Sequence, residues 1–398
     1  MKIAIISNEF PPLMSSGAVQ VRDLAKEFSN NGHDVTVFTA TYGLHKSYDI
    51  EEYKGYKVVR FRAFRSKDVG YVKRTISEIF TPFKMLNGIK KSPISKTKWD
   101  GVVWYSPTIF LGPVARYFTK ASKCRGYLIV RDIFPEWAVD MGLISKGLPY
   151  RVLKLFENYQ YSIADVIGVQ AKGNLPYFSK WNTKRNTKVE VLNNWLAHTG
   201  SKPSSIAVKD TSLAGRKIFI YAGNMGVAQG IEILFQLVIN LKEKKDIGFL
   251  FVGRGSEMER FRCEATLRSL DNVLFFDQID ADEIPSLYKQ CHVGMLSLDV
   301  KHKTHNIPGK FLSYIASGLP VLASVNPGND LIDLINRSRT GRVVCDADVI
   351  SLVAAANELV HIIDSDGVSS TRKSCIALSE ELFRPASAVS QIVAALKS

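Results

Sequence analysis

The sequence of 398 residues has no run of 18 or more apolar residues, so we expect no transmembrane helix. Its five cysteines are scattered without a CxxC pair, which argues against structural zinc and fits free thiols in a reducing cytosol. Low-complexity tracts and solenoid repeats are also missing. The opening residues, MKIAIISNEFPP, carry no cleavage-site pattern and predict a β-strand instead of a signal peptide. What is left is a globular protein long enough for two domains of ordinary size.

One stretch of the chain carries most of the positive charge. The formal net charge is +14, and residues 60–98 contain eleven Lys or Arg against Asp68 and Glu78. Apolar residues recur there at helical spacing between cations, and Thr81-Pro82 predicts a break into two short helices. The residues concerned are Val72, Lys73, Arg74, Ile76, Ile79, Phe80, Phe83 and Lys84. A basic amphipathic segment of this kind predicts docking on an anionic membrane surface. The alternative is an ordinary surface helix whose apolar stripe packs on the core.

Strands and helices alternate along both halves of the chain. In the first half we expect strands at 2–7, 35–39, 58–61, 101–104, 126–130 and 166–169, and helices at 18–30, 112–121 and 150–162. In the second half we expect strands at 218–221, 248–252, 273–276, 293–298 and 321–323, and helices at 231–242, 257–268, 283–289 and 386–397. This alternation predicts two α/β domains with mostly parallel sheets. Their expected bounds are 1–198 and 216–398, with a linker at 199–215 and a last helix able to cross back.

The segment Asn306–Ser324, NIPGKFLSYIASGLPVLAS, is typical of a loop, a short helix and a buried strand. Gly318 ends the helix and Pro320 precedes the strand, as expected of helix stop signals. Lys310 lies in or near the first helical turn, where a cation opposes the helix macrodipole. An anionic ligand, bound by backbone amides and Lys310 together, would resolve this conflict. The alternative is a solvated lysine on a loop.

Two glycine-rich turns follow predicted strands. Tyr221–Gly230, YAGNMGVAQG, leads into a helix, and its glycines would let the backbone approach a phosphate closely. Phe251–Gly255, FVGRG, is a second turn of this kind, with Arg254 available for a diphosphate. Neither turn has the GxGxxG fingerprint, and tight strand-to-helix turns explain the glycines equally well.

Five segments occur in order over nearly the whole chain: SNEFPPLMSSGAVQVRDLAKEFSNNGHDVTVFT, YAGNMGVAQGIEIL, FVGRGSEMERF, PSLYKQCHVGMLSL and PGKFLSYIASGLPVLAS. Together they resemble the GT-B glycosyltransferases of family 4. RDIFPEWAVDMGLISKG is similar to a segment of the bacterial L-fucosamine (L-FucNAc) transferases of O-antigen assembly. The resemblance implies two Rossmann-like domains facing each other across a cleft, and a retaining sugar transfer without an obligatory metal or cofactor.

The resemblance also implies the substrates and the site residues. The donor would be UDP-L-FucNAc or another UDP-linked N-acetylated sugar, bound by the C-terminal domain. The acceptor would be a polyprenyl-diphosphate-linked saccharide at the inner face of the plasma membrane. Catalysis would rest on electrostatic stabilisation of the departing nucleoside diphosphate. The implied diphosphate contacts are Gly17, Gly223, Asn224, Gly226, Gln229, Arg254 and Lys310, the catalytic candidates are Arg131, Asp132 and His305, and Ser313 would contact the ribose.

The chain departs from the family pattern at five of these positions. An Arg and a Lys of the family's first glycine-rich turn fall on the neutral Asn224 and Gln229, which leaves the positive charge to Arg254 and Lys310. A family His aligns with Arg131. The two carboxylates of the family's Glu-x7-Glu pattern fall on His305 and Ser313. Ser313 can offer the ribose only a neutral hydrogen bond, which is weaker than that of a carboxylate.

Two other functions fit part of the pattern. A hydrolysing UDP-GlcNAc 2-epimerase shares the GT-B fold, but it depends on several cleft carboxylates and Ser313 offers none. A nucleic-acid-binding module is suggested only by the isoelectric point of about 9.4. The cations cluster beside apolar residues, and no nucleic-acid motif is present. His302 and His305 have no evident third ligand in the sequence, so we expect no metal site.

Overall fold

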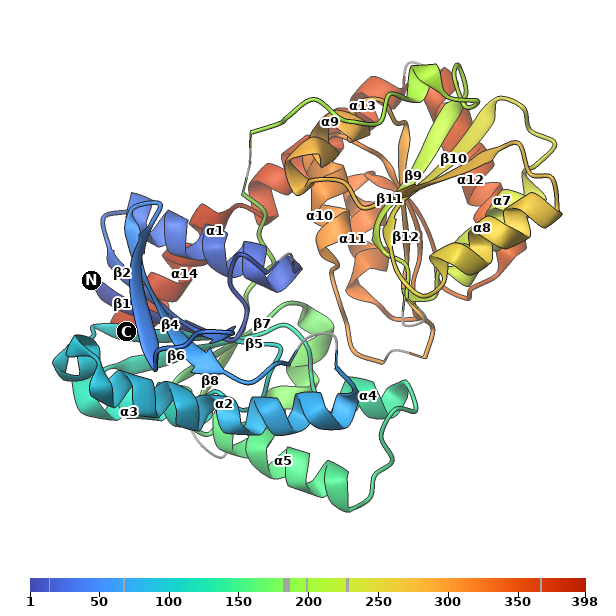
Figure 1. The fold of residues 1–398 in the computed structure, drawn as a ribbon. Coiled ribbons are helices and arrows are strands. Elements are labelled where there is room, and N and C mark those ends of the chain that lie inside the picture. The colour runs from blue at the N-terminus through green and yellow to red at the C-terminus, as the bar shows by residue number, and fades with distance from the viewer. Residues whose placement is uncertain are drawn as a thin grey trace. The chain divides into compact units, whose positions relative to one another are not determined.

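The computed structural model describes residues 1–13, 15–66, 69–181, 187–197, 200–226, 229–301, 303–365 and 367–398. The chain forms two compact units, each a sheet with helices on both faces (Figure 1). The first unit comprises Met1–Trp195 and Pro385–Ser398, and the second comprises Leu196–Arg384. The last helix therefore belongs to the first unit. None of the helices in the described ranges is long and apolar enough to cross a membrane.

The first unit is built on an eight-stranded sheet in the order β3-β4-β2-β1-β5-β6-β7-β8. All strands are parallel except β3, an edge strand that pairs antiparallel with β4. The strands are β1 (Lys2–Ser7), β2 (Asp34–Tyr42), β3 (Tyr48–Tyr53), β4 (Tyr56–Ala63), β5 (Gly101–Ser106), β6 (Arg125–Val130), β7 (Val166–Val169) and β8 (Lys188–Val191). Successive strands are added to one side of the sheet up to β4 and to the other side from β5 onward, so the strand order switches between β1 and β5. Open α/β sheets bind ligands at such a switch point, beyond the carboxyl ends of the strands.

Helices cover both faces of this sheet because side chains alternate along each strand. Ile3 and Ile5 belong to the core under α1 (Ser16–Asn30) and α14 (Pro385–Lys397), whereas Ala4 and Ile6 belong to the core on the other face. The helices on that other face are α2 (Tyr71–Lys91), α3 (Gly112–Ser122) and α5 (Leu148–Tyr161). Shorter pieces are η1 (Pro93–Lys96), α4 (Glu136–Asp140) and η2 (Lys172–Phe178).

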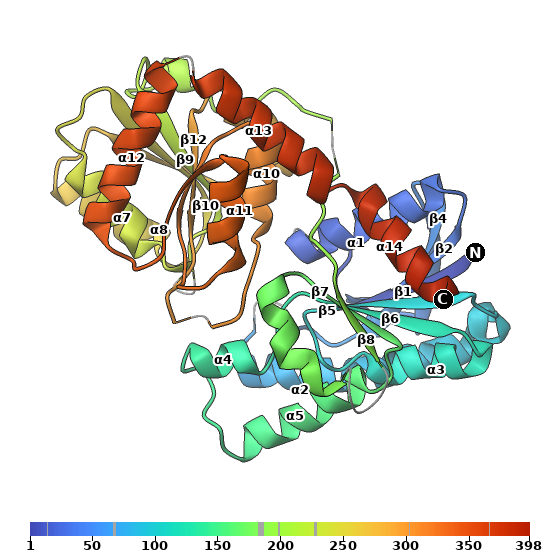
Figure 2. The same cartoon turned by 180° about the vertical axis from the view of Figure 1, so that it is seen from behind.

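The second unit has a six-stranded parallel sheet in the order β11-β10-β9-β12-β13-β14, the order of a dinucleotide-binding Rossmann fold. The strands are β9 (Lys217–Asn224), β10 (Ile247–Arg254), β11 (Val273–Asp277), β12 (Val293–Ser297), β13 (Val321–Ser324) and β14 (Gly341–Val344). The helices and short turns are η3 (Val208–Asp210), α7 (Glu232–Asn240), α8 (Met258–Leu267), η5 (Ala281–Glu283), α9 (Ile284–Tyr288), α10 (Gly309–Ala316), α11 (Asp330–Ser338), α12 (Val349–Asp364) and α13 (Gly367–Leu382). The helices α7, α8 and α12 pack on one face of the sheet, where their buried side chains form a hydrophobic core with those of the strands. Figure 2 shows α10, α11 and α13 together within this unit.

The prediction of two parallel-sheet α/β domains is confirmed, but the predicted break at Thr81-Pro82 is wrong. Residues Tyr71–Lys91 form one helix with Pro82 inside it. Proline removes only one intrahelical donor. The hydroxyl of Thr81 donates to the carbonyl oxygen of Ser77 at 2.8 Å, which keeps this turn hydrogen-bonded. Thr81 and Pro82 are both buried against the sheet, so tertiary packing outweighs the local preference for a break.

Candidate functional site

Two glycine-rich turns lie side by side at the carboxyl edge of the second sheet. β9 and β10 pair in parallel through Gly223–Gly253 and Asn224–Arg254 at their last residues. Gly253 has a φ of +154°, and a β-carbon there would overlap the backbone of Gly223. Beyond the pair, the amide of Met225 donates to the carbonyl oxygen of Arg254 at 2.7 Å. The glycines are therefore required for the two strand ends to pack as one backbone surface.

The side chain of Lys310 crosses this surface. Lys310 is the second residue of α10, and its Cε would lie 2.8 Å from a β-carbon placed on Gly223. Its Nζ lies 4.6 Å from the ring centroid of Tyr221, whose hydroxyl donates to the carbonyl oxygen of Asn224 at 2.7 Å. Burial lowers the pKa of Lys310 to about 8. Lys310 is thus held between the first glycine turn and an aromatic ring.

The ammonium group of Lys310 has no carboxylate partner in the described part of the chain. A cation–π contact contributes only about 0.5–2 kcal/mol, less than a burial that lowers a lysine pKa this far implies. An anion at this place would supply the missing counter-charge. The first turn of α10 adds the unpaired amides and positive macrodipole of a helix N-terminus.

The position in the sheet favours ligand binding. The strand order of the second sheet switches between β9 and β12. Open α/β sheets bind ligands at such a switch point, beyond the carboxyl ends of the strands. The turn after β9 is anchored to the end of β12, because the hydroxyl of Ser297 donates to the carbonyl oxygen of Gln229 at 2.9 Å. Gly230 has a φ of +59°, and a β-carbon there would lie 2.9 Å from the backbone of Asp299. Backbone packing within the protein therefore accounts for this glycine, and its approach to a phosphate stays a prediction.

The remaining predicted residues of the second unit lie around the same edge, and they differ in how accessible their side chains are to a ligand. Asn224 and Arg254 are exposed at the ends of their strands, where a ligand can reach both side chains. The hydroxyl of Ser313 donates to the carbonyl oxygen of Lys310 at 2.9 Å, so its acceptor lone pairs are what it can offer a ribose. His305 is half-buried, with Nδ1 3.6 Å from a carboxylate oxygen of Asp330. His302 lies outside the described residues.

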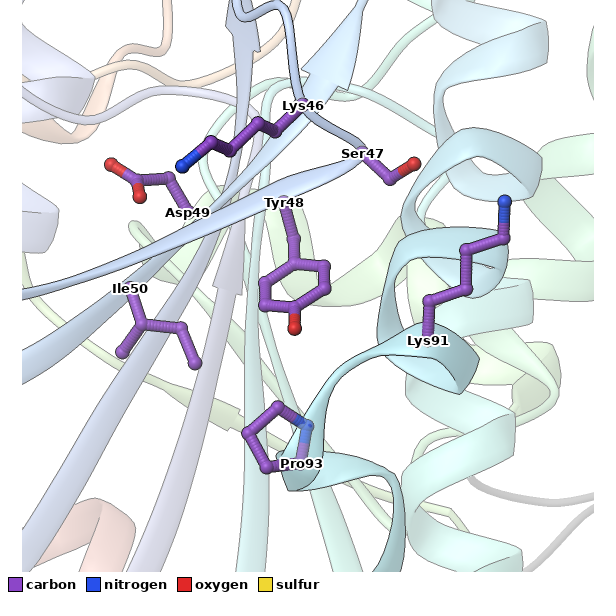
Figure 3. A pocket seen from close by; sticks show the side chains of 7 residues that line it. All are labelled: Lys46, Ser47, Tyr48, Asp49, Ile50, Lys91 and Pro93. Atoms are coloured by element: carbon purple, nitrogen blue, oxygen red, sulfur yellow. The ribbon is translucent and has the colours of Figure 1, made fainter.

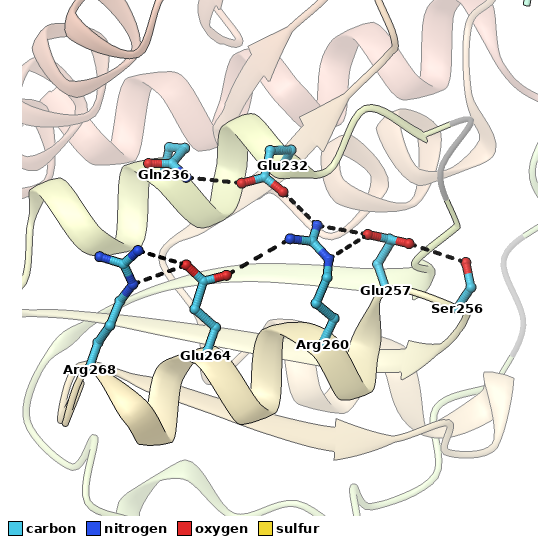
Figure 4. A network of polar contacts seen from close by, with 7 residues as sticks. All are labelled: Glu232, Gln236, Ser256, Glu257, Arg260, Glu264 and Arg268. Atoms are coloured by element: carbon cyan, nitrogen blue, oxygen red, sulfur yellow. Dashed lines mark hydrogen bonds and ion pairs between the residues drawn. The ribbon is translucent and has the colours of Figure 1, made fainter.

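A charged network braces the helices that follow the two turns (Figure 4). Arg260 of α8 contacts the carboxylates of Glu232 at 2.5 Å, Glu257 at 2.7 Å and Glu264 at 3.8 Å. Burial would raise the pKa of Glu232, but hydrogen bonds from Gln236 and Arg260 outweigh it and the pKa is lowered. The network joins the start of α7 to the start of α8, and so it fixes both glycine turns at their helical ends.

In the first unit, α1 begins at the carboxyl end of β1 beside a buried carboxylate. Ser15 is the N-cap, and its hydroxyl oxygen accepts from the amide of Ala18 at 3.2 Å. The same hydroxyl donates to Oε2 of Glu9 at 3.0 Å, and Glu9 is 7% exposed. A β-carbon on Gly17 would overlap Oε2 of Glu9, so glycine is required at this helix start. Sequence reasoning selected Gly17 and missed Glu9, for which the sequence holds no motif.

Arg131 lies at the end of β6, buried in a network that holds the carboxyl edge of the first sheet. Its guanidinium is 4.5 Å from the ring of Trp195, and Nη1 donates to the carbonyl oxygen of Leu192 at 3.0 Å. Burial lowers its pKa. This geometry makes Arg131 a positioning residue in the structure, and its predicted catalytic role stays a prediction. Asp132 is half-buried and follows it directly.

Buried amides extend this network across the strand ends. The hydroxyl of Tyr105 donates to Oε1 of Gln20 at 2.5 Å, and Gln20 donates to Asn194 at 3.2 Å. Asn194 donates to Gln170 at 3.1 Å, and Gln170 donates to the carbonyl oxygen of Arg131 at 2.7 Å. Each member is polar and buried, and burial without hydrogen bonds would cost free energy. The chain of bonds therefore fixes the relative positions of β5, β6 and β7 ends with α1.

The apolar stripe of α2 faces solvent. Val72, Ile76, Phe80 and Phe83 are 74%, 51%, 50% and 56% exposed, respectively. Ser77, Thr81, Met85 and Ile89 occupy the opposite, buried face. Ile79, the fifth apolar residue of the predicted stripe, is partly buried against Ile109, Phe110 and Leu153. The alternative that the stripe packs on the core therefore holds only for Ile79. Lys84 lies with Nζ 4.4 Å from the ring of Phe64, which is itself half exposed, and Arg74 pairs with Glu78 at 2.8 Å. Lys73 is exposed on the stripe side.

A shallow cavity of about 360 Å³ lies at the C-terminal end of α2 (Figure 3). Lys46 and Lys91 line it on two sides of Tyr48, and the side chain of Lys46 extends toward Asp49. Its charge is therefore mixed, unlike that of the α2 stripe. Over the described residues, no group of three or more His, Cys, Asp or Glu side chains is placed to hold a metal ion.

Comparison with known proteins assigns this architecture. Residues 216–361, which include Lys310 and both glycine turns, match the family described as glycosyl transferases group 1. The chain has the GT-B fold. It superimposes on HepE from Anabaena in complex with UDP with a TM-score of 0.69, 15% identity and full coverage of both chains. It superimposes on WaaG, a glycosyltransferase involved in lipopolysaccharide biosynthesis, with a TM-score of 0.66 and 14% identity over 98% of this chain and 99% of WaaG.

Sequence similarity extends beyond the matched family segment. The probable glycosyltransferase WbjE of Pseudomonas aeruginosa is 23% identical over 311 residues, covering 76% of each chain. The comparisons therefore support a glycosyltransferase of group 1.

Proposed function

We propose that this GT-B protein is a retaining glycosyltransferase that takes its sugar from a nucleoside diphosphate sugar. The observation that carries the proposal is the position of Lys310, buried on Tyr221 and Gly223 at the carboxyl edge of a Rossmann sheet. A diphosphate there would be bound by Lys310, by amides at the start of α10, and by Arg254. As the glycosidic bond breaks, negative charge develops on that diphosphate, and the same groups would stabilise it.

The donor is proposed to be UDP-linked and N-acetylated, with UDP-L-FucNAc as the first candidate. The resemblance of the RDIFPEW segment to L-fucosamine transferases supports the sugar, and the UDP complex of the structurally similar HepE supports the base. Metal-independent catalysis follows if cationic side chains replace the divalent ion that would neutralise a diphosphate. Asn224 and Gln229 are neutral, so Arg254 and Lys310 would provide that charge in the second unit.

The acceptor is proposed to be a polyprenyl-diphosphate-linked saccharide in surface polysaccharide or O-antigen assembly, at the cytoplasmic face of the plasma membrane. The name of WaaG links this fold to lipopolysaccharide biosynthesis in that protein. The exposed stripe of α2, with Phe80 and Phe83 beside Lys73 and Lys84, supports attachment to an anionic bilayer. A lipid-linked acceptor would then be reached from the membrane surface.

Calorimetry with UDP tests the donor site. The double variant Lys310→Ala/Arg254→Ala is expected to fold and to bind UDP at least about 100-fold more weakly, because two charge-assisted contacts are lost. The matched control is Lys245→Ala/Arg268→Ala, which removes the same charge at the amino edge of the second sheet. Near wild-type affinity in the first variant would contradict the assignment. A panel of UDP, GDP, ADP and dTDP measures the base, and NMR of the product anomeric carbon measures retention.

A further inference from the structure

A second cavity, of about 410 Å³, lies in the second unit. Its lining residues are Arg339, Gly341, Arg342, Leu359, Ile362, Ser370, Thr371 and Ser374. Gly341 is the first residue of β14, so the cavity lies at the amino edge of the sheet. Gly223 lies at the carboxyl edge, with Lys310 packed over it. The cavity is therefore separate from the proposed donor site.

Two guanidinium groups give this cavity an excess of positive charge. Arg342 is held in place, because Nε donates to Glu358 at 2.6 Å and Nη1 donates to the carbonyl oxygen of Gly341 at 3.0 Å. Arg339 follows the end of α11 and is exposed. It forms no ion pair with any carboxylate that the structure describes. One carboxylate thus faces two arginines.

The rest of the lining combines hydroxyl groups with an aliphatic floor. Ser370 and Ser374 are one turn apart on α13, so they share a face of that helix, and Thr371 lies beside them. Leu359 and Ile362 of α12 supply the floor, and Leu359 is 1% exposed. Guanidinium forks and hydroxyls bind phosphate oxygens, whereas the aliphatic floor suits the carbon part of an ester. A cavity of this size lies within the range of small-ligand sites.

We propose that this cavity is a binding site for a small phosphomonoester, distinct from the nucleoside diphosphate site. Arg339 and Arg342 bind the phosphate group, Ser370 and Ser374 donate to its oxygens, and the apolar surface of Leu359 and Ile362 covers the esterified carbon atoms. The inference does not depend on the proposed glycosyltransferase reaction, because none of its residues belongs to the donor site. Occupancy stabilises the unit by preferential binding to the folded state.

Methyl NMR of the full chain gives a local readout of this site. Titration with inorganic phosphate, and then with glycerol 3-phosphate, is expected to shift the methyl signals of Ile362 and Leu359. The methyl group of Ile307, three residues before Lys310, reports on the donor site. Glycerol serves as the control without phosphate. Shifts at Ile307 with none at Ile362 would place phosphate only at Lys310 and overturn the proposal.

Two variants measure the contribution of the cavity. Arg339→Gln is expected to weaken phosphate binding at Ile362 about tenfold, as the loss of a charge-assisted contact predicts. The matched control Arg337→Gln removes the same charge two residues away, from a side chain that is 81% exposed and pairs with Asp333. Ser374→Glu, which puts a carboxylate into the cavity, is expected to abolish binding while UDP affinity stays unchanged. Wild-type phosphate affinity in both Arg339→Gln and Ser374→Glu would refute the site.

Discussion

A β-carbon on Gly223 would lie 2.8 Å from Cε of Lys310, closer than side chains pack. The φ of Gly223 is +134°, a region that residues with a side chain rarely adopt. Gly223 therefore does two things at once: it permits the backbone of the first turn, and it leaves the space that the lysine side chain occupies. The position of the buried cation depends on this glycine as much as on α10.

Gly223→Ala should therefore impair the donor site by displacing Lys310. We expect UDP affinity to fall at least about tenfold and the free energy of unfolding to fall by about 1–3 kcal/mol, from backbone strain and overpacking. The control is Gly309→Ala, next to Lys310, where a β-carbon would meet nothing within 4 Å. Calorimetry and chemical denaturation measure the two quantities. Equal UDP affinity in both variants would show that the lysine does not bind the diphosphate.

The lowered pKa of Lys310 predicts that the proposed nucleotide binding depends on pH. In the free protein the pKa is about 8, so the charged fraction falls to roughly a tenth at pH 9. A bound diphosphate raises that pKa, and UDP affinity should fall by up to about fivefold between pH 8 and pH 9 but little between pH 6.5 and pH 7.5. At pH 8, calorimetry in buffers of different ionisation enthalpy should detect proton uptake on binding. A flat affinity profile from pH 7 to pH 9 would contradict this linkage.

The same pKa shift makes the folded protein more stable as pH rises, whereas nucleotide affinity falls. The pKa is about 8 in the folded protein and about 10.5 in the unfolded chain, so the unfolded state holds more protons between these values. This group therefore destabilises the fold below pH 8, and that cost is relieved as pH rises toward 10. Lys310→Met should lose this pH-dependent term and bind UDP weakly at every pH. The measurement is the difference in unfolding free energy between wild type and variant at pH 7 and pH 9.

Local sequence patterns predicted the elements that carry the proposed donor site, and they could do so for physical reasons. Glycines after apolar strands and a lysine at a helix start violate local preferences, and such violations mark ligand sites. The same reasoning missed the contact of Lys310 with Tyr221, because 89 residues separate them and only the sheet register brings them together. Glu9 was missed for a different reason: it lies in a loop without a motif, and its position against Gly17 depends on how α1 follows β1.

The basic segment shows the limit of local rules in the other direction. Its apolar periodicity predicted a helix, but the sequence could not decide which face of that helix meets the sheet. The structure buries the face of Ser77 and Thr81 and exposes that of Phe80. Small and hydroxyl residues allow close packing against the sheet, which apolar pattern alone does not reveal.

The first unit offers a steric test at the start of α1. Gly17→Ala places a methyl group on Oε2 of Glu9, and we expect it to lower the thermal stability of the protein. Because the resemblance implies that Gly17 contacts the diphosphate, we also expect weaker UDP binding. Adding Glu9→Ser shortens the opposing side chain and should restore thermal stability lost in Gly17→Ala. If Gly17→Ala alone is as stable as wild type, the close packing of Glu9 against this glycine is refuted.

If the protein docks on membranes as proposed, binding should depend on Phe80, Phe83, Lys73 and Lys84 of α2. Phe80→Ser/Phe83→Ser should weaken binding to vesicles containing anionic lipid by at least about tenfold, since each aromatic side chain loses apolar burial of about 1.5–3 kcal/mol when fully inserted. Lys73→Glu/Lys84→Glu should weaken vesicle binding more at low salt than at high salt. Each lysine near an anionic surface contributes about 1 kcal/mol, and salt screens that attraction. The matched control is Leu267→Ser/Ile350→Ser, where the side chains are 85% and 76% exposed on the second unit. Vesicle sedimentation measures the partition coefficient. Equal binding by the α2 variants and the control would show that α2 does not carry the protein to the membrane.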